Sequence, residues 1–330
     1  MASNQQVLLR RRPEGVPTAD CFELREGPVP VPGPGEVLLR HEFLSLDPYM
    51  RGRMSAAKSY AAPVALGAVM EGQCVGRVER SEAPGFAVGD HVVGGAGWQQ
   101  WSAVAAARLH KLDPAMEHRS LALGLLGMPG LTAYLGMTDI GQAKAGETVV
   151  VSAATGAVGS VAGQLARLAG ARAVGIAGGA EKCRFAMEEL GFEACIDHRG
   201  DLGAGLEAAC PDGIDVYFEN VGGAVQRAVF PRLADFGRMI MCGMVAEYNL
   251  AEPPPGPNLM STFRKRLRIQ GLIVSDQWNR LGEWHAKAGP LVAAGTLRYR
   301  EDVVDGLERA PEAFFGLLRG ENFGKLVVRL

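Results

Sequence analysis

The sequence predicts an α/β protein in which a doubly wound parallel sheet is inserted into an antiparallel β-barrel domain. Three observations support this prediction. Residues 1–120 contain short alternating apolar runs separated by Pro and Gly, without an extended helical pattern. From Ser120 onward, strand-like runs alternate with helical patterns, which is typical of a parallel sheet covered by helices. The closing segment is more β-like than the middle, so we expect it to return to the first domain, with domains at 1–122, 123–297 and 298–330.

The first domain is expected to consist of short antiparallel strands. Val7–Arg10 is predicted to pair with Phe22–Arg25, and alternating prolines between residues 28 and 34 form a stiff connector. Many short strands bounded by turn residues are typical of a barrel. Further strands are predicted at 35–43, 75–79, 90–93 and 101–104.

The middle domain is expected to alternate strands and helices with right-handed crossovers. Helices are predicted at 121–128 and 131–137, separated by a break at Gly127–Gly130, and from 275 to about 294. The closing segment is predicted as a strand at 297–303, a helix at 304–318 and a strand at 324–330. The parallel strands are predicted at 148–153, 172–177, 194–197, 214–218, 238–242 and 267–274.

A glycine-rich turn follows the first of these parallel strands. Thr148–Ser152 has the length and β-branching of a buried strand, and it leads through Ala153 and Gly156–Gly159 into an amphipathic helix. A helix N-terminus offers free N–H groups and positive potential to a pyrophosphate. The pattern is AxxGxxG rather than GxGxxG, so a plain strand-to-helix turn is the alternative interpretation.

The segment after the next strand favours NADP(H) over NAD(H). In NAD-specific folds, an acidic residue about 20 positions past the glycine turn holds the ribose 2′-hydroxyl. Gly178 and Gly179 stand there instead, followed by Lys182 and Arg184, so no carboxylate repels a 2′-phosphate and two cations can pair with it. The alternative is that Lys182 and Arg184 belong to a solvated first helical turn.

Composition narrows the classes of partner. The net charge is −2 and no basic stripe is visible, so nucleic acid is not expected. Arg10–Arg12 is not followed by an apolar segment, and no apolar stretch reaches the ~20 residues of a membrane span, so neither a signal peptide nor a membrane partner is expected.

The cysteines and histidines are scattered along the chain. Six cysteines without CxxC spacing predict buried thiols and a reducing, cytoplasmic compartment. His41 and His91 lie in strand-like runs and are expected to be sheet histidines rather than ligands. We therefore expect no metal site.

Several strings together resemble a known family. The chain is similar to the zinc-independent branch of the medium-chain dehydrogenase/reductase superfamily, and within it to the leukotriene B4 dehydrogenase, prostaglandin reductase and alkenal double-bond reductase group. The resemblance spans nearly the whole chain, with strings at 46–54 (LDPYMRGRM), 127–134 (GMPGLTAY), 153–161 (AATGAVGSV), 181–185 (EKCRF), 218–223 (FENVGG), 247–249 (EYN) and 320–325 (GENFGK).

The resemblance implies a GroES-like first domain completed by the C-terminal segment, an inserted Rossmann domain, NADP(H) in the cleft between them, no metal and a homodimer. It implies that Gly156, Ala157, Val158 and Gly159 cradle the pyrophosphate and that Lys182 binds the 2′-phosphate. Asn220 is expected beside the ribose and pyrophosphate. The further cofactor contacts that it implies are Met128, Thr132, Cys242, Gly243, Met244, Tyr248, Leu272, Ile273, Val274 and Asn322.

One position departs from the family pattern. Where the family often has Ile-Asn-Tyr near the adenosine phosphate, this chain has Ile196-Asp197-His198. The imidazole of His198 can still stack or donate a hydrogen bond, although its charge varies with pH. Whether His198 contacts the 2′-phosphate or the adenine is left open.

Reduction of an activated C=C bond requires few protein groups. Hydride from the nicotinamide goes to the β-carbon, and a hydrogen-bond donor must stabilise the enolate-like oxygen. We expect Tyr248 to be this donor, because its loop lies at the carboxyl end of the sheet, where ligands bind in such folds. Tyr49, from the barrel, is the second candidate. The alternatives are that Tyr248 caps a surface loop and that Tyr49 is a core residue with a satisfied hydroxyl.

The sequence thus predicts an NADPH-dependent reductase of 2-alkenals or enones, of the 2-alkenal or 13-oxoprostaglandin reductase type. An NADPH quinone reductase of the same superfamily and a non-catalytic NADPH-binding protein are the alternatives. Arg51 and Arg53 are expected in structural or dimer-facing ion pairs. Trp98 and Trp101 are expected either to wall an apolar substrate site or to pack within the barrel.

Overall fold

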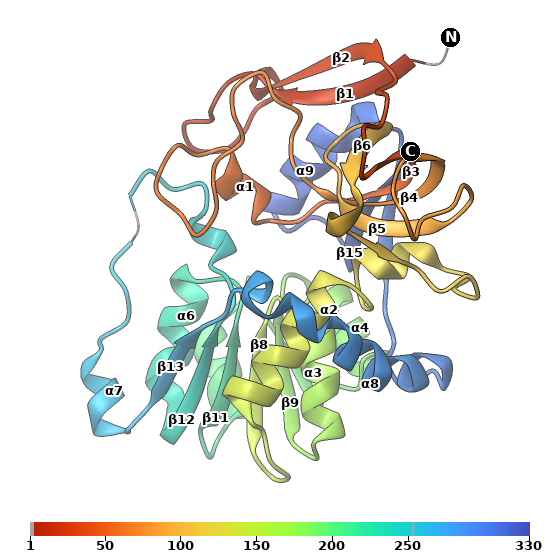
Figure 1. Ribbon diagram of the computed structural model, residues 1–330. Helices are drawn as coiled ribbons and strands as arrows, with labels where there is room; N and C mark the ends of the chain where they lie inside the picture. Colours follow the sequence, from red (N-terminus) through yellow and green to blue (C-terminus); the bar gives the residue numbers. More distant parts are fainter. Residues whose placement is uncertain (1–2, 253) are drawn as a thin grey trace.

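The structure, a computed structural model, describes residues 3–252 and 254–330. Two main sheets organise it, a six-stranded sheet in the lower part of Figure 1 and a seven-stranded sheet in the upper part. A two-stranded ribbon of β1 (Ser3–Leu9) and β2 (Phe22–Pro28) lies beside the latter. The predicted fold class is confirmed.

The six-stranded sheet is parallel throughout and has the order β10-β9-β8-β11-β12-β13. The chain enters at β8 in the middle and winds outward in both directions, so the strand order reverses beside β8. In open sheets of this kind, ligands bind outside the carboxyl ends of the strands at that reversal. The strands are β8 (Thr148–Ser152), β9 (Arg172–Ala177), β10 (Ala194–Asp197), β11 (Ile214–Glu219), β12 (Leu233–Met241) and β13 (Arg268–Gly271).

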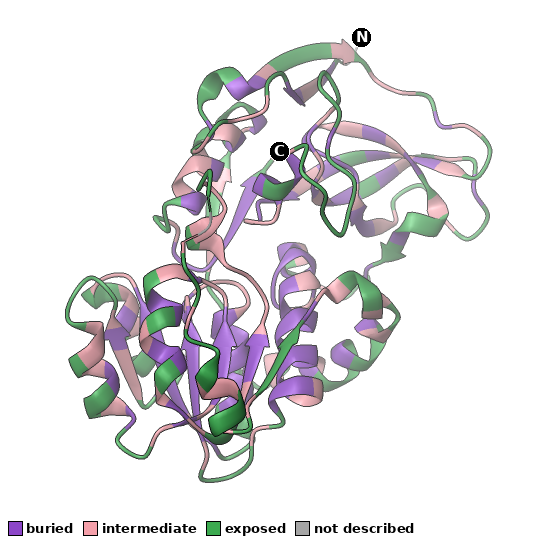
Figure 2. Cartoon of the chain, turned by 90° about the vertical axis from the view of Figure 1, so that its left-hand side faces the viewer, coloured by how far each residue is buried: buried purple, intermediate pink, exposed green. Residues whose placement is uncertain are grey.

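Helices cover both faces of this sheet, which explains why β8 is buried at every position, with three valines between Thr148 and Ser152. Val149 and Val151 belong to one core cluster and Val150 to the cluster on the opposite face. Figure 2 shows the buried strands enclosed by helices whose outer sides are exposed. The covering helices are α2 (Met128–Leu135), α3 (Gly159–Leu168), α4 (Ala180–Glu188), α5 (Leu202–Ala209), α6 (Gly223–Val229) and α8 (Leu281–Ala293).

The seven-stranded sheet has the order β14-β15-β3-β4-β5-β7, with β6 also paired to β3. Its pairings are antiparallel except for the parallel pair β14–β15. Trp98 stacks on Phe22 and contacts the edge of Phe314 in the core of this lobe. The strands are β3 (Glu36–Ser45), β4 (Gln73–Ser81), β5 (His91–Gly95), β6 (Trp101–Ala105), β7 (Leu109–Lys111), β14 (Glu301–Asp305) and β15 (Lys325–Arg329).

The C-terminal strand returns to the first lobe, as the sequence predicts. β15 pairs antiparallel with β3, with Val327 opposite Ser45. The parallel sheet therefore lies within the chain between two parts of one mixed sheet. We propose domain boundaries near residues 122 and 297 on this basis.

Two predicted helix boundaries are wrong. Arg119–Leu123 is a 3₁₀ turn, η3, and α2 begins at Met128, inside the predicted break. Pro129 lies in the first turn of α2, where a missing N–H leaves no hydrogen bond unmade. Helix α2 then continues into a π-helical segment, η4 (Gly136–Gly141).

The closing segment also differs from its prediction. β14 spans Glu301–Asp305, where a strand ending at 303 and a helix from 304 were expected, because these residues pair with β15. Helix α9 (Ala310–Leu318) follows the turn η8 (Leu307–Arg309), with a proline in its first turn. The remaining short elements are η1 (Ala19–Cys21), α1 (Met50–Arg53), η2 (Ala106–Arg108), η5 (Phe230–Arg232), η6 (Val245–Glu247), α7 (Met260–Arg264) and η7 (Val274–Arg280).

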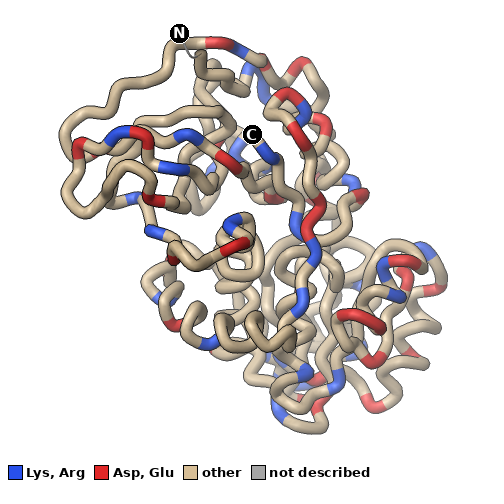
Figure 3. Tube along the Cα trace, turned by 90° about the vertical axis from the view of Figure 1, so that its right-hand side faces the viewer, with Lys and Arg blue, Asp and Glu red and all other residues tan. Residues whose placement is uncertain are grey.

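The surface carries both signs of charge. Figure 3 shows Lys and Arg interspersed with Asp and Glu along both lobes. Among the residues that the structure describes, no helix is long and apolar enough to cross a membrane.

Candidate active site

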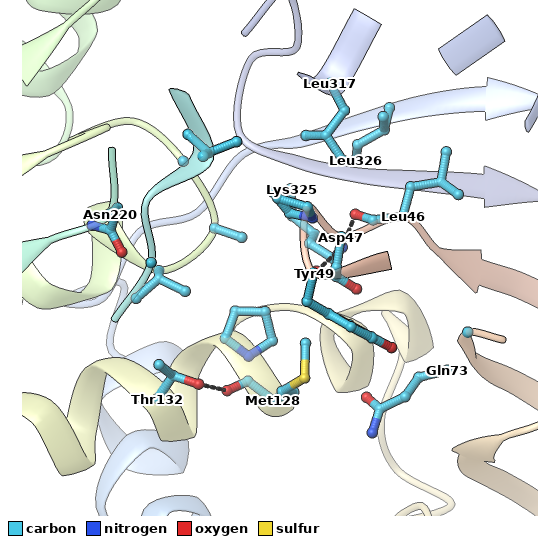
Figure 4. A pocket seen from close by; sticks show the side chains of 18 of the residues that line it. Leu46, Asp47, Tyr49, Gln73, Met128, Thr132, Asn220, Leu317, Lys325 and Leu326 are labelled. Carbon is cyan, nitrogen blue, oxygen red and sulfur yellow. Dashed lines mark hydrogen bonds and ion pairs between the residues drawn. The ribbon is translucent and has the colours of Figure 1, made fainter. Parts of the chain in front are cut away.

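A cavity of about 1090 Å³ lies between the parallel sheet and the barrel lobe. The segments that follow the carboxyl ends of β8, β9, β10, β11, β12 and β13 all line it, at Gly156–Gly159, Gly178, His198, Asn220, Cys242 and Leu272 respectively. The opposite wall comes from the barrel and from the returning segment. Figure 4 shows Asn220 on one side of this pocket and Tyr49, Asp47 and Lys325 on the other.

The glycine turn after β8 requires small residues. A Cβ on Gly159 would lie 2.3 Å from the carbonyl oxygen of Ala153, and Ala153 itself has a positive φ of 50°. A side chain at Gly159 would therefore displace the backbone. The first turn of α3 also leaves backbone N–H groups without intrahelical partners. Gly156 donates its own N–H to the Ala153 carbonyl oxygen at 2.9 Å, so the donors that the turn offers to a ligand are those of Ala157, Val158 and Gly159, which line the cavity with it.

At the end of the cavity near β9 and β10, the cations differ partly from those predicted. Lys182 lines the cavity and donates to the carbonyl oxygen of Gly320 at 2.7 Å. Arg184 is exposed and lies outside the lining, whereas Arg199 lines it beside His198. Burial and the neighbouring charge of Arg199 lower the pKa of Lys182. Lys182 and Arg199, rather than Lys182 and Arg184, are therefore the cations that line this end of the cavity.

Asp197 orders this end of the cavity. Its side chain accepts hydrogen bonds from the backbone N–H of Arg199 at 3.0 Å and of Gly179 at 2.9 Å. These two bonds lower the pKa of Asp197, so it stays ionised. The sequence signal for Arg199 was its place directly after a predicted strand, the position from which loop residues reach a ligand in this fold.

Asn220 is held at the carboxyl end of β11 by a buried carboxylate. Its side-chain amide donates to the Ser152 carbonyl oxygen at 2.8 Å. Glu219 is fully buried, and it accepts hydrogen bonds from the Ser152 hydroxyl at 2.9 Å, from Tyr217 at 2.8 Å, and from two backbone N–H groups of the following turn. The sequence analysis did not identify this network, which fixes the turn that carries Asn220.

Tyr248 lies in the loop after β12 and lines the cavity. Its hydroxyl accepts a hydrogen bond from the Met244 backbone N–H at 3.4 Å, which leaves its own O–H proton available as a donor. Burial raises the pKa of Tyr248, so the phenol stays protonated at neutral pH. Met244 is the one implied cofactor residue that lies outside the lining, and its side chain packs against Gly222 instead.

Tyr49 lines the cavity from the barrel side, at the start of α1. Burial, with a smaller contribution from the charge of Asp47, raises the pKa of Tyr49 well above its usual range. Tyr49 and Tyr248 are therefore two protonated phenols in the lining of the cavity. Each comes from a different lobe.

A buried ion pair that the sequence analysis missed lies beside Tyr49. The Lys325 ammonium donates to Asp47 Oδ1 at 2.9 Å and to the Leu46 carbonyl oxygen at 2.8 Å (Figure 4). Ser45 donates to the other oxygen of Asp47. The side chains of Lys325 and Asp47 are 5% and 8% exposed, so each charge depends on the other.

The remaining predicted cofactor residues also line the cavity. Thr132 and Met128 lie on α2, where the Thr132 hydroxyl donates to the Met128 carbonyl oxygen at 2.8 Å (Figure 4). Asn322 reaches the cavity from the returning segment and donates to the carbonyl oxygen of Gly324. The others are Cys242, Gly243, Leu272, Ile273 and Val274.

Two tryptophans and two arginines resolve alternatives left by the sequence. Trp98 packs inside the barrel, and Trp101 lies outside the cavity lining, with the guanidinium of Arg40 5.8 Å from its ring centre. Arg53 forms the expected ion pair, with Glu71 at 2.6 Å. Arg51 forms no ion pair within the described chain, because its hydrogen-bond partners there are neutral oxygens.

The histidines and cysteines of the described chain show no arrangement for a metal. No group of three or more His, Cys, Asp or Glu side chains there is placed to hold an ion. His41 is a satisfied sheet histidine, with Nδ1 2.6 Å from the Gln99 carbonyl oxygen and Nε2 2.7 Å from the Ser102 hydroxyl. All six cysteines are free, and burial raises the pKa of Cys242 to about 12.

The fold and this site define a nicotinamide-dependent oxidoreductase with a Rossmann cofactor sheet. Residues 5–112 match the family described as the N-terminal domain of oxidoreductase, and residues 157–288 match the family described as zinc-binding dehydrogenase. The chain is 50% identical to the NADPH-dependent curcumin reductase of Escherichia coli (strain K12), over 99% of this chain and 97% of that protein.

Two further relatives and one solved structure indicate the same family. Prostaglandin reductase 1 of Rattus norvegicus is 42% identical over 97% of each chain, and the NADP(+)-dependent 2-alkenal reductase of Nicotiana tabacum is 39% identical over 99% of this chain and 97% of its own. The crystal structure of CurA in complex with NADPH from Vibrio vulnificus has a TM-score of 0.94 and 49% identity over 98% of each chain. The chain belongs to the zinc-independent group of the medium-chain dehydrogenases/reductases, and its cofactor is NADP(H).

Proposed function

We propose that this protein reduces the α,β C=C bond of 2-alkenals and enones at the expense of NADPH. The observation that supports this proposal is the composition of one cavity. It combines a glycine turn and cations suited to a phosphorylated dinucleotide with two protonated phenols, Tyr248 and Tyr49, from opposite lobes. The relatives named for curcumin, prostaglandin and 2-alkenal reduction support the same substrate class.

Different residues of the cavity bind different parts of NADPH. The turn at Gly156–Gly159 binds the pyrophosphate through the backbone N–H groups of its last three residues, and Asn220 lies beside the ribose. Lys182 and Arg199 bind the 2′-phosphate, with His198 next to them. When bound, NADPH supplies the hydride that the β-carbon of the substrate receives.

The protein's part in the chemical step is to orient and polarise the substrate. The Tyr248 hydroxyl donates a hydrogen bond to the substrate carbonyl oxygen and stabilises the enolate that develops there. Tyr49 contacts the substrate from the barrel side and stays neutral because of its burial. The α-carbon of the enolate then takes a proton from water, which completes the reduction.

The test is the oxidation of NADPH by the purified enzyme with a panel of 2-alkenals, enones and quinones. We expect loss of NADPH absorbance with the enals and enones, and mass spectrometry should find the saturated carbonyl product. A faster rate with quinones than with every enone would favour the quinone reductase alternative. Tight binding of NADPH without turnover on the whole panel would indicate a non-catalytic binding protein.

We also propose a homodimer that forms through β13. This strand is the edge of the parallel sheet among the described residues, and all its residues are exposed. Phe236 and Phe263, which are 64% and 68% exposed, add apolar surface near this edge. An exposed strand edge offers unpaired backbone groups to another strand. For localisation we propose the cytoplasm, because all six cysteines are free thiols.

A further inference from the structure

Arg51 is a buried cation that faces away from the cavity. Its residue is 7% exposed, and it lies on α1 two positions after Tyr49. Its Nε donates to the side-chain oxygen of Asn249 at 3.0 Å, and its Nη2 donates to the carbonyl oxygen of Gly15 at 2.8 Å. Neither Arg51 nor Asn249 lines the cavity.

The partners of Arg51 give it no compensating charge. Both acceptors are neutral, and burial lowers the pKa of Arg51. Burial of a charge without an opposite charge is unfavourable, and hydrogen bonds to neutral groups offset that cost only in part. An apolar side chain at this position would therefore serve stability as well. What the guanidinium adds is a directional hydrogen bond from Arg51 to Asn249, which joins two segments that are 198 residues apart in the chain.

The connection joins the segments that carry Tyr49 and Tyr248, two of the tyrosines that line the cavity. Asn249 directly follows Tyr248, and Arg51 belongs to the helix that begins after Tyr49. Gly15 lies against the same point, since a Cβ there would be 3.7 Å from the Asn249 carbonyl oxygen. The Arg51–Asn249 hydrogen bond therefore holds the loop after β12 against the barrel.

The other end of the same loop is attached to the parallel sheet. Glu247 accepts a hydrogen bond from the Gly223 backbone N–H at 2.7 Å, and the Val245 N–H donates to the Asn220 carbonyl oxygen at 3.2 Å. Tyr248 thus lies between an attachment to the sheet at Glu247 and an attachment to the barrel at Asn249. Removal of the second attachment leaves the loop fixed on the cofactor side alone.

We propose that Arg51 is a positioning residue, which acts through Asn249 to fix the Tyr248 hydroxyl relative to Tyr49 across the substrate crevice. This inference rests on the proposed function, because it assigns both tyrosines to the substrate. A displacement of about 1 Å at a reacting group can lower the rate up to about 100-fold. The effect is therefore expected in turnover rather than in the binding of NADPH.

The test compares Arg51→Met, Asn249→Ala and the double variant with the wild type. Each single variant should lower kcat on an enone about tenfold or more, while the dissociation constant of NADPH, from fluorescence titration, changes less than about twofold. The double variant should be no slower than the slower single variant, because both break one connection. Asn249→Asp, which keeps an acceptor at the same place, should retain most of the activity.

Arg238→Met is the matched control. Arg238 is also a partly buried arginine with several hydrogen bonds, to Glu147 and to the carbonyl oxygens of Gly141 and Gln142, but it lies outside the cavity lining. This variant should lose thermal stability without a loss of kcat. An unchanged kcat in Arg51→Met, or fully additive losses in the double variant, would overturn the proposal. If Arg51→Met does not fold, Asn249→Ala decides alone by the same criteria.

Hydrogen–deuterium exchange separates this inference from the proposed function. With NADPH bound, Arg51→Met and Asn249→Ala should both raise exchange in residues 243–250, whereas Arg238→Met should not. If the wild type reduces no enone, the proposed function fails, and the exchange result still decides whether the connection holds the loop. Unchanged exchange in both variants contradicts the inference in either case.

Discussion

At the scale of single residues, the hydroxyl of Tyr248 combines two properties. It accepts a hydrogen bond from the Met244 N–H, and burial raises its pKa. The hydrogen bond fixes the position of the hydroxyl oxygen, and the raised pKa keeps the proton on that oxygen. A donor with both properties can stabilise a developing enolate without losing its proton to solvent.

Replacement of Tyr248 by Phe should therefore lower kcat about tenfold or more on an enone, since one preorganised donor is lost. Steady-state kinetics with a saturating NADPH concentration would measure this. Tyr299→Phe is the control, because Tyr299 lies outside the cavity lining. Equal rates for Tyr248→Phe and wild type would remove this hydroxyl from the mechanism.

The pH dependence of the rate gives a second prediction. Because burial raises the pKa of Tyr248 and Tyr49, the rate should not fall on the alkaline side until the pH exceeds about 10, the ordinary pKa of tyrosine.

The choice between NADPH and NADH is predicted to depend on two cations. Lys182→Ala and Arg199→Ala should each weaken NADPH binding about tenfold or more, because each removes a charge-assisted contact to the 2′-phosphate. NADH binding should change little. Arg184→Ala, which alters an exposed cation outside the cavity, should change neither constant. Fluorescence titrations with both cofactors would measure these effects, and equal losses for NADPH and NADH would contradict the assignment.

His41 should make the stability depend on pH. Burial lowers its pKa to about 4, against an ordinary value of 6.5. Between these values the unfolded chain binds more protons than the folded protein, so the free energy of unfolding rises with pH across that window. Lowering the pH from about 7 to about 5 should reduce the free energy of unfolding by about 2 kcal/mol through the protonation of His41 in the unfolded chain. Urea unfolding at both pH values would measure the change, which His41→Gln should diminish; an equal change in that variant would refute the attribution.

At the scale of elements, the buried pair Asp47–Lys325 joins the segment after β3 to the first residue of β15. Lys325→Met should lower the free energy of unfolding by about 3–5 kcal/mol, because it leaves the Asp47 carboxylate buried without its partner. The double variant Asp47→Leu, Lys325→Met should recover much of this loss. Urea unfolding would measure both. A double variant less stable than Lys325→Met would show that the pair contributes more than mutual compensation.

Helices and strands that a local pattern of apolar residues defines were predicted correctly from the sequence. The central strands β8, β9 and β11 appear where apolar runs were found, because a strand covered on both faces is buried along most of its length. The wrong boundaries, at α2 and β14, fall where local signals conflict with context. Pro129 reads as a helix break, but in the structure it starts a helix. Glu301–Asp305 is a strand because β15 lies beside it, and this neighbour is not visible in a local window.

At the scale of the whole molecule, the exposed edge at β13 leads to a prediction about assembly. Ile269→Lys should shift a dimer toward monomer, because it replaces the one large apolar side chain of β13, at the edge that a second copy would cover, with a charge. Size-exclusion chromatography with light scattering would measure the mass. Val88→Lys, at an exposed residue in the barrel lobe, is the control and should leave the mass unchanged. A wild type that is monomeric at every concentration would refute the proposed dimer.

The sequence by itself determined the two kinds of sheet, the glycine turn and the preference for NADP(H), and all the catalytic and cofactor residues that it named, except Met244 and Arg184, line the cavity. These depend on periodicity, turn chemistry and positions at strand ends, which are properties of short segments. The tertiary structure alone decided that Arg199 rather than Arg184 lines the cavity beside Lys182, that Lys325 neutralises Asp47, and that Arg51 donates to Asn249 in the loop after β12. The last two contacts join residues 278 and 198 positions apart, and such partners are chosen by how the sheet and the barrel pack together rather than by any local pattern.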